Sequence, residues 1–483
     1  MRVLRALREM QIPSVAVFSD IDRRSLHVQM ADEAVPIGPA ASSQSYLAGG
    51  RILQAAQLTG AEAIHPGYGF LSENAAFAKS CGEAGVKFIG PAWRAIEQMG
   101  SKTSARRVAM QAGAPVVPGT EQGISEAAEA RRMAAEVGYP VLLKAAQGGG
   151  GKGMRRVEAE ADLDSAMRAA SSEAERAFGS GEIYIEKLIE RPRHIEVQVL
   201  GDEHGHIIHL GERECSIQRR HQKVVEECPS PLMLAKPELR EEIGEAALRI
   251  ARAVNYASAG TLEFLADQDG RFYFLEMNTR LQVEHPVTEW VTGIDLVRWQ
   301  LRIAAGERLT IEQQDVRWHG SALECRIYAE DPENNFFPSP GQIIHYQEPS
   351  GPGVRCDSGA YPGWTVPIEY DPLLAKLSVW SETREGSIQR MRRALTEYGV
   401  SGITTNLQLF EQLMTDSRFA DGQLHTAFLD EFMKSFGKRF DPSALVASVL
   451  AAAQAGKRPS QNSEEPSCAA TIWRGEGRRG LLR

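Results

Sequence analysis

The chain has 483 residues, of which 43% are hydrophobic and 24% charged. This balance is typical of a soluble globular protein and excludes disorder along the whole chain. Acidic residues outnumber basic ones by 63 to 54, giving a formal net charge of −9, which is poorly suited to a nucleic acid backbone. At about 150 residues per domain, the length predicts roughly three domains or subdomains.

Cysteine spacing and apolar runs narrow the class of protein further. The six cysteines include no Cys-x-x-Cys pair, which argues against a structural zinc site and a disulfide framework. The longest apolar stretch, 444–453, is too short to cross a bilayer, and the N-terminus lacks a signal-peptide pattern. We therefore expect a cytoplasmic enzyme that binds neither nucleic acid nor a membrane.

Helix and strand patterns alternate along the first two hundred residues. Strands separated by helices predict βαβ units with a parallel sheet, although the chain begins in a helix where a doubly wound domain normally begins with a strand. The predicted helices are 1–10, 51–58, 75–83, 103–112, 125–137 and 161–178, and the predicted strands are 14–18, 61–64, 86–89, 139–145, 154–157 and 182–187. Residues 189–432 are richer in strands, and the last fifty residues become polar.

A glycine run, QGGGGKGM at 147–154, separates two predicted strands. Glycines let backbone N–H groups approach phosphate oxygens closely. The run is not a Walker A loop, because Gly153 follows Lys152, and it is not a dinucleotide fingerprint, because no helix follows. We interpret it as a flap over phosphates, which Lys144 on the preceding strand supports; a hairpin tip without function is the alternative.

The segment 261–278 predicts a hairpin with carboxylates on one face. An Asp-Gly pair at 269–270 separates two apolar runs and is a strong signal for a two-residue turn. Such a turn puts Glu263 opposite Glu276, with Asn278 on the same face. Because opposed like charges destabilise a ladder, we predict a hard divalent cation such as Mg²⁺ at this point. Two solvated glutamates are the alternative.

Three further segments carry candidate functional residues. If the chain after 278 is extended, Arg280, Gln282 and Glu284 share one side and suit a small oxyanion and the removal of its proton; a surface salt bridge is the alternative. The basic run Arg219, Arg220, His221 and Lys223 is typical of a solvated face. The loop HPGYGFLSEN at 65–74 follows a predicted strand, where binding loops and structural turns both occur.

Together these segments resemble biotin carboxylase, a member of the ATP-grasp superfamily. The resemblance covers Met1 to about residue 435 and rests on six segments in order: 65–74, Lys144 with 148–153, 219–227, 276–286, 324–331 and 370–376. It implies a mixed α/β and α+β fold. Its parts are a doubly wound N-terminal domain at 1–100, an ATP-grasp fold at 101–305 with a mobile flap at about 117–188, a β-rich C-terminal subdomain at 306–435 and a linker or tail at 436–483.

The resemblance also implies roles for particular residues. ATP contacts would be Lys102, Lys144, Glu186, Lys187, Ile189, His194, Gln218 and His221, with Gly149, Gly150 and Gly151 on the flap. Glu263, Glu276 and Asn278 would hold Mg²⁺ or Mn²⁺ beside the nucleotide. Lys223, Arg280, Gln282 and the Val283 backbone would bind bicarbonate. Glu284 would be the base that deprotonates bicarbonate, and Arg326 would stabilise the biotin enolate.

The implied activity is ATP- and bicarbonate-dependent carboxylation of biotin through carboxyphosphate, the first half-reaction of an acetyl-CoA or other acyl-CoA carboxylase, as in fatty acid biosynthesis. The alternatives are another ATP-grasp ligase and a non-catalytic scaffold subunit. The final acceptor is not encoded in this chain. Because no Met-Lys-Met attachment context or carrier domain is present, we expect a separate biotin carboxyl carrier protein, carboxyltransferase subunits and a homodimer.

The chain departs from the family pattern in two other respects. It lacks the opening strand and the loop resembling Asn-Arg-Gly-Glu-Ile-Ala, for which a natural loss, a misassigned start and a truncation are the open explanations. Gln147 and Lys152 stand where relatives often have glycine and arginine, a difference that we expect to preserve function.

Overall fold

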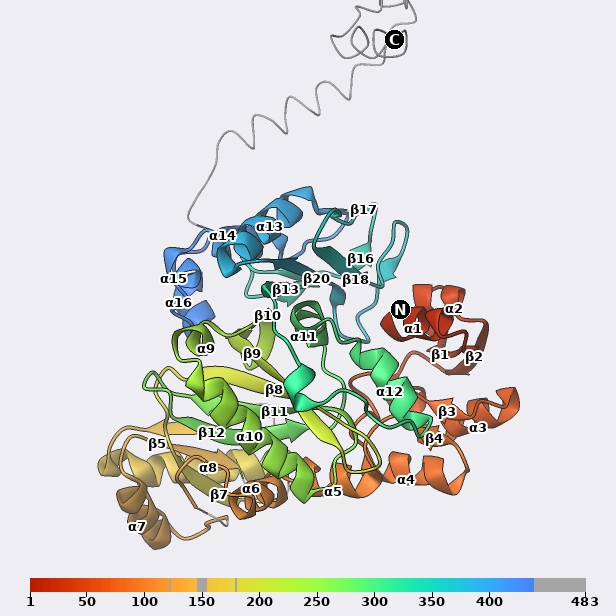
Figure 1. Cartoon of the computed structure of the whole chain (residues 1–483). Helices are drawn as coiled ribbons and strands as arrows, with labels where there is room; N and C mark the ends of the chain where they lie inside the picture. The colour runs from red at the N-terminus through yellow and green to blue at the C-terminus, as the bar shows by residue number, and fades with distance from the viewer. Residues whose placement is uncertain (121–122, 146–153, 179, 438–483) are drawn as a thin grey trace, which may run out of the picture. The chain divides into compact units, whose positions relative to one another are not determined.

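The structure is a computed structural model, and the residues that it describes are 1–120, 123–145, 154–178 and 180–437 (Figure 1). The chain separates into two units, Met1–Phe436 and Gly437–Arg483, and the second unit, with the predicted tail, lies outside the described residues except for Gly437. None of the described helices is both long enough and apolar enough to cross a membrane. Also outside the description are Gln147, Gly149, Gly150, Gly151 and Lys152.

The N-terminal segment confirms the predicted helices and strands, but they do not form one sheet. β1 (Val15–Ser19) pairs in parallel with β2 (Glu33–Gly38), and β3 (Ala63–Ile64) pairs in parallel with β4 (Lys87–Phe88). No described strand joins the two pairs. The helices here are α1 (Arg2–Glu9), α2 (Leu26–Met30), α3 (Gly49–Thr59), α4 (Ala75–Glu83) and α5 (Trp93–Gly100), with the 3-10 turns η1 (Asp20–Asp22) and η2 (Ser42–Gln44).

The sheet around the glycine run has one apolar face and one polar face. β5 (Val141–Ala145) pairs with β6 (Arg155–Val157) on one side and with β7 (Ile183–Lys187) on the other, both antiparallel. Val141 and Leu143 pack against α7 (Ala127–Val137) and α8 (Glu160–Phe178). Because strand side chains alternate, Lys144 takes the opposite face. α6 (Lys102–Gln111) precedes this unit.

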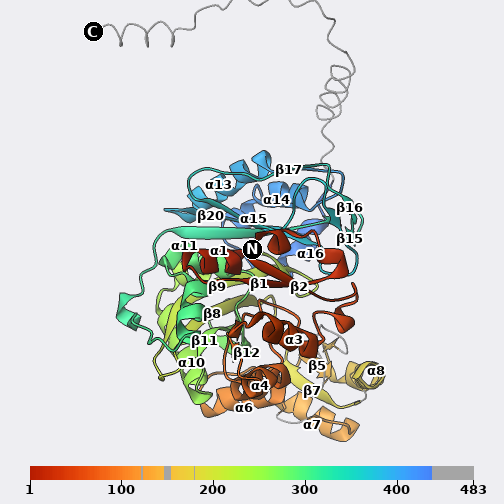
Figure 2. The ribbon, with the colours of Figure 1, turned by 90° about the vertical axis from the view of Figure 1, so that its right-hand side faces the viewer.

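In the described part of the chain, eight strands form one large antiparallel sheet that extends across residue 305, from the ATP-grasp segment into the C-terminal segment (Figures 1 and 2). Its order is β12 (Phe272–Asn278), β11 (Ser258–Ala266), β8 (Arg193–Gly201), β9 (Ile207–Arg219), β10 (Gln222–Cys228), β13 (Ser321–Tyr328), β20 (Leu373–Ser381) and β18 (Val354–Ser358). Residues far apart in sequence therefore share one surface.

Helices cover the large sheet and leave a polar face toward the site. α10 (Glu238–Ala253) packs on β8 and β9 over Ile195, Val197 and Val199, so the alternating side chains of β8 face away from it. α11 (His285–Thr292) packs on β13 and β20. The other helices are α9 (Pro231–Ala235), α12 (Leu296–Ala304), α13 (Arg384–Glu397), α14 (Leu407–Leu413), α15 (Ser417–Ala420), α16 (Phe428–Met433) and the 3-10 turn η3 (Gln313–Asp315).

Short strand pairs complete the C-terminal segment, in agreement with the predicted β-rich character. The pairs are β14 (Glu330–Asp331) with β15 (Phe337–Pro338), β16 (Gly341–Gln342) with β19 (Thr365–Val366), and β17 (His345–Gln347) with β21 (Gly399–Ser401). The core of this segment joins β13 and β20 to α13 and α14 through residues such as Leu323, Leu377, Met391 and Phe410.

The β11–β12 hairpin confirms that Glu263 lies opposite Glu276, but the predicted two-residue turn is wrong. The Asp267 N–H donates to the Arg271 carbonyl at 2.8 Å, so the loop contains the three residues 268–270. A bulge then compensates for the extra residue: Phe264 pairs with Phe274 and Glu263 with Glu276, which leaves Leu275 unpaired. The longer loop shifts the register of the two strands by one residue and the bulge shifts it back, so Glu263 still lies opposite Glu276.

Deleting Leu275 is expected to turn Glu276 away from Glu263, because the bulge sets the face of the side chains that follow it. The deletion should abolish the rise in melting temperature that Mg·ATP produces, while circular dichroism stays near that of the parent protein. As a matched control, deleting Gln268 shortens only the loop and should preserve the rise. Equal responses from the two deletions would contradict this account of the bulge.

Candidate active site

All predicted site residues that the structure describes line one cavity of about 720 Å³. The cavity lies among β5, β7, the polar face of the large sheet and the segment 279–284. The predicted site residues that line it are Lys102, Lys144, Glu186, Lys187, Ile189, His194, Gln218, His221, Lys223, Glu263, Glu276, Asn278, Arg280, Gln282, Val283, Glu284 and Arg326.

Three glutamates form a row across neighbouring strands of the large sheet. Glu276 on β12 lies opposite Glu263 on β11, which in turn lies opposite Glu196 on β8. Glu196 is fully buried and Glu263 is 4% exposed. Opposed like charges destabilise a sheet, and a buried charge requires a partner. The row therefore needs cations close to it.

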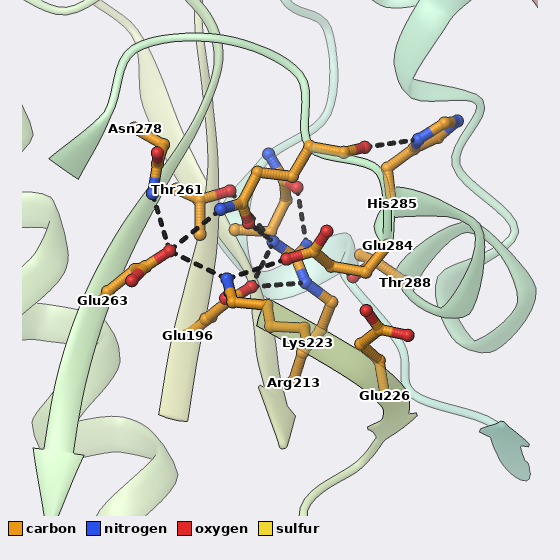
Figure 3. Close-up of polar contacts among 12 residues, drawn as sticks. Glu196, Arg213, Lys223, Glu226, Thr261, Glu263, Asn278, Glu284, His285 and Thr288 are labelled. Carbon is orange, nitrogen blue, oxygen red and sulfur yellow. Dashed lines mark hydrogen bonds and ion pairs between the residues drawn. The ribbon is translucent and has the colours of Figure 1, made fainter. Parts of the chain in front are cut away.

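Lys223 and Arg213 supply those cations. The Lys223 Nζ contacts Glu196 and lies 2.8 Å from Glu263 Oε1 and 2.9 Å from Glu284 Oε1 (Figure 3). Arg213 lies directly across from Glu196 and donates two hydrogen bonds to its Oε2, at 3.1 and 3.0 Å. Burial alone would lower the pKa of Lys223, but Glu263 and Glu284 raise it above its ordinary value.

Two neighbouring members of the glutamate row, Glu263 and Glu276, differ in their proton affinity. Burial alone would raise the pKa of Glu263, but Lys223 and His194, whose Nε2 lies 3.0 Å from Glu263 Oε2, hold it below its ordinary value. Burial and the neighbouring Glu263 raise the pKa of Glu276. Among the described residues, Glu276 has no hydrogen-bond or ion-pair partner.

This donor set fits a hard divalent cation. The carboxylates of Glu263 and Glu276 face each other, and that of Glu276 has no partner among the described residues. A cation bound between them would remove their mutual repulsion. The Asn278 Nδ2 donates to Glu263 at 2.6 Å and its Oδ1 accepts from Arg280 at 3.0 Å. Because an amide oxygen has two lone pairs, the Asn278 Oδ1 can accept from Arg280 and also bind an ion.

The chain after β12 does not keep the extended conformation that would place Arg280, Gln282 and Glu284 on one side. The backbone turns at Glu284, with φ −79° and ψ 7°, and enters α11. Arg280 points to Glu73, with its Nε 2.9 Å from Glu73 Oε2. Gln282 instead donates to Glu263 at 3.0 Å and accepts from Arg213 at 2.7 Å. The three predicted side chains line the same cavity through a turn rather than through strand alternation.

Glu284 is held between two cations. Its Oε1 lies 2.9 Å from Lys223 Nζ, and its Oε2 accepts from Arg326 Nη2 at 2.9 Å. Burial opposes ionisation, but Lys223 and Arg326 hold the pKa of Glu284 well below its ordinary value. The Nε of Arg326 also donates to the buried Glu226, at 2.6 Å. Glu284 is therefore ionised here and a weak base in this arrangement.

The end of the cavity nearer the glycine run combines charge with apolar surface. Lys144 forms an ion pair with Glu186, and Lys187 donates to the carbonyls of Gly138 and Tyr139 at 2.9 and 3.0 Å. Apolar surface beside a few placed charges is typical of a small-molecule site. Apart from Ile189 and Val283, the apolar lining was not predicted; it includes Val117, Leu142, Met154, Leu188, Leu265 and Leu275.

In both the basic run 219–223 and the loop at 65–74, some residues contact the site and others make contacts that support the fold. Lys223 faces the cavity, whereas Arg219 pairs with Glu330 at 3.0 Å. In the loop, His65 accepts from the Gly67 N–H at 3.0 Å, and burial lowers the His65 pKa to about 4, as suits a structural turn. Glu73, from the same loop, instead reaches Arg280.

Sequence reasoning missed Glu73, Glu196, Arg213 and Glu226. A signal for Glu196 was present, because it lies two residues after His194 and therefore on the same strand face. The others meet the site only through chain segments distant in sequence, and no local pattern marks them.

Family models match most of the chain. The model of the biotin carboxylase N-terminal domain matches residues 1–96, and that of the biotin carboxylase C-terminal domain matches 324–431. Between them, the carbamoyl-phosphate synthase L chain ATP binding domain matches 101–312. With a sheet-lined cavity that suits a nucleotide and a divalent cation, this defines an ATP-dependent ligase of the ATP-grasp class.

Relatives support the same class over nearly the whole chain. Biotin carboxylase 1 of Bacillus subtilis is 51% identical over 432 residues, 89% of this chain and 96% of that one. The solved biotin carboxylase subunit of pyruvate carboxylase has a TM-score of 0.80 and 49% identity, covering 91% of this chain and 97% of that one. The chain therefore belongs to the biotin carboxylase family. This membership favours neither of the two alternatives, a non-catalytic scaffold subunit and another ATP-grasp ligase.

A second solved structure supports the ligand classes. The biotin carboxylase domain dimer of Hydrogenobacter thermophilus 2-oxoglutarate carboxylase, in complex with MgADP, ADP and bicarbonate, has a TM-score of 0.85 and 49% identity, covering 91% of this chain and 96% of that one. ATP, Mg²⁺, bicarbonate and biotin are thus the ligands and substrates of the family to which the chain belongs.

Replacing Glu276 by Gln is expected to abolish the rise in melting temperature that Mg·ATP produces, because one of the two opposed carboxylates is lost. The same change should raise the melting temperature without ligand, since it removes repulsion from Glu263. Asp269→Asn, on the exposed loop of the same hairpin, is the matched control and should alter neither. A normal Mg·ATP response in Glu276→Gln would overturn the metal assignment.

Glu324 predicts a second, pH-dependent effect. It is fully buried on β13 without a hydrogen-bond partner for either oxygen among the described residues, and burial raises its pKa to about 8. An unfolded chain releases this proton at a pH near 4.3, so the group destabilises the fold increasingly as the pH rises from about 4.3 to 8. Glu324→Gln should therefore raise the melting temperature more at pH 8 than at pH 5, and a pH-independent difference would contradict this.

Proposed function

We propose that this protein carboxylates biotin on a separate carrier protein, using ATP and bicarbonate through carboxyphosphate. The observation that supports this most is the meeting of Lys223, Glu284 and Arg326 in the cavity that Glu263 and Glu276 also line. An anion-binding cation, a carboxylate base and a second cation thus lie beside a nucleotide-sized space.

ATP would lie between the two sheets that border the cavity. Lys102, Lys144 and the glycines at 149–151 would face its phosphates, and the apolar side chains would pack on the base. Glu263, Glu276 and Asn278 would hold Mg²⁺ or Mn²⁺, which offsets the negative charge of the phosphates when bound. Further nucleotide contacts would come from Glu186, Lys187, Ile189, His194, Gln218 and His221.

Bicarbonate would bind to Lys223, Arg280, Gln282 and the Val283 N–H. Because Lys223 and Arg280 are ion-paired with carboxylates, an incoming anion must compete with those partners. As Lys223 turns toward bicarbonate, Glu284 loses part of the attraction that holds its pKa low, and it becomes a better base. Substrate binding thus activates the base that must deprotonate it.

Arg326 would stabilise the enolate that forms when the ureido nitrogen of biotin gives its proton to the phosphate released from carboxyphosphate. Its Nε remains bonded to Glu226 while Nη2 exchanges Glu284 for the substrate, so the guanidinium stays oriented. Arg280 would add a second positive charge beside the same anion. Carbon dioxide released from carboxyphosphate would then be captured by the biotin nitrogen.

The assembly and setting of the protein are also proposals. We infer a homodimer, a biotin carboxyl carrier protein and carboxyltransferase subunits as partners, and a cytoplasmic location. The division into 1–100, 101–305 with a mobile flap at about 117–188, 306–435 and 436–483 is kept as predicted. Relatives serve pyruvate and 2-oxoglutarate carboxylases by name, so a 2-oxo acid joins acetyl-CoA and other acyl-CoA among the candidate acceptors.

The test is ADP release from Mg·ATP, which should require bicarbonate and increase several-fold when free biotin is added. Glu284→Gln should lower this rate about 100-fold or more, because the base is lost, yet it should keep the melting shift with Mg·ATP. ADP release that is indifferent to biotin in the parent protein would overturn the proposed function.

A further inference from the structure

The segment 279–284 carries the proposed bicarbonate residues but belongs to no helix or strand. Its peptide groups therefore lack the hydrogen bonds of a ladder, and other groups must fix them. Two buried side chains that reach no proposed substrate position do this. They are His285, at the start of α11, and Lys376, on β20.

His285 fixes the peptide between Gln282 and Val283. Its ring is fully buried, and its Nδ1 lies 2.7 Å from the Gln282 carbonyl oxygen. Because a carbonyl only accepts, Nδ1 carries the proton, and burial lowers the His285 pKa well below its ordinary value, so the ring is neutral. A trans peptide is planar, so this bond also directs the Val283 N–H away from the ring.

That N–H is a free donor within the described part of the chain. No described residue accepts a hydrogen bond from it, and Val283 lines the cavity. A peptide N–H held in a cavity without an acceptor is a preformed donor for an anion. Its direction depends on the contact between His285 and Gln282.

Lys376 fixes the next peptide. Its Nζ donates to the Val283 carbonyl at 2.6 Å, and the residue is 3% exposed. Lys376 lies directly opposite Arg326 in the β13–β20 ladder. Neighbouring strands thus hold successive residues: Lys376 holds the backbone of Val283, and Arg326 holds the carboxylate of Glu284.

We propose that His285 and Lys376 are positioning residues that orient the Val283 N–H and the Glu284 carboxylate for bicarbonate. The proposal rests on the proposed function. A competing explanation is that Lys376 serves only to neutralise Asp357, whose carboxylate lies 3.8 Å from its Nζ. The hydrogen bond to Val283 is much shorter than that ion pair, so the backbone contact is the closer interaction.

The experiment measures bicarbonate-dependent ADP release, with KM for bicarbonate and for ATP determined separately. Lys376→Met and His285→Leu should raise the KM for bicarbonate about tenfold or more, while the KM for ATP and the Mg·ATP melting shift stay within about twofold. His285→Asn, whose amide can replace Nδ1 as the donor, should restore a KM near that of the parent protein.

Asp357→Asn separates the hydrogen bond from the charge, because it leaves Nζ beside Val283, and it should leave the KM for bicarbonate unchanged. A rise equal to that of Lys376→Met would overturn the role of the hydrogen bond. If Lys376→Met does not fold, the His285→Leu and His285→Asn pair decides, and equal KM values for bicarbonate in that pair would overturn the proposal. Absence of biotin-stimulated turnover in the parent protein would instead count against the proposed function.

Discussion

The active-site geometry depends on electrostatic repulsion among glutamate carboxylates that the large sheet places side by side. Glu276, Glu263 and Glu196 are neighbours on three adjacent strands, and two of them are buried. Lys223 contacts both buried members of the row and also Glu284, so one cation links the nucleotide side of the cavity to the proposed base. Moving it changes the electrostatics at both sites simultaneously.

The hairpin shows which structural features local sequence patterns can predict. Alternation and the Asp-Gly signal correctly predict that Glu263 faces Glu276, yet the turn is longer than expected and a bulge at Leu275 corrects the register. Alternation along a strand reports which residues share a face, whereas a bulge depends on how both strands pack. The pair was therefore predictable, but the route by which the chain reaches it was not.

Contacts that join distant segments set the limit of sequence analysis. Arg213 can be identified as a site residue only from the pairing of β9 with β8. Glu73 can be identified only from the contact of its loop with Arg280. An extended chain after 278 would place Arg280, Gln282 and Glu284 on one side, but the backbone turns at Glu284 and enters α11. Without the partner strands, neither the burial nor the charge of these groups can be assigned from sequence.

The same arrangement links substrate binding to chemistry. Three cations that line the cavity are already paired within the protein: Lys223 with three carboxylates, Arg326 with Glu226 and Glu284, and Arg280 with Glu73. An anionic substrate can enter only by exchanging some of these pairs. An exchange at Lys223 or Arg326 weakens the hold on Glu284 and raises its affinity for a proton. In the proposed mechanism, Glu284 therefore becomes a stronger base when bicarbonate displaces Lys223.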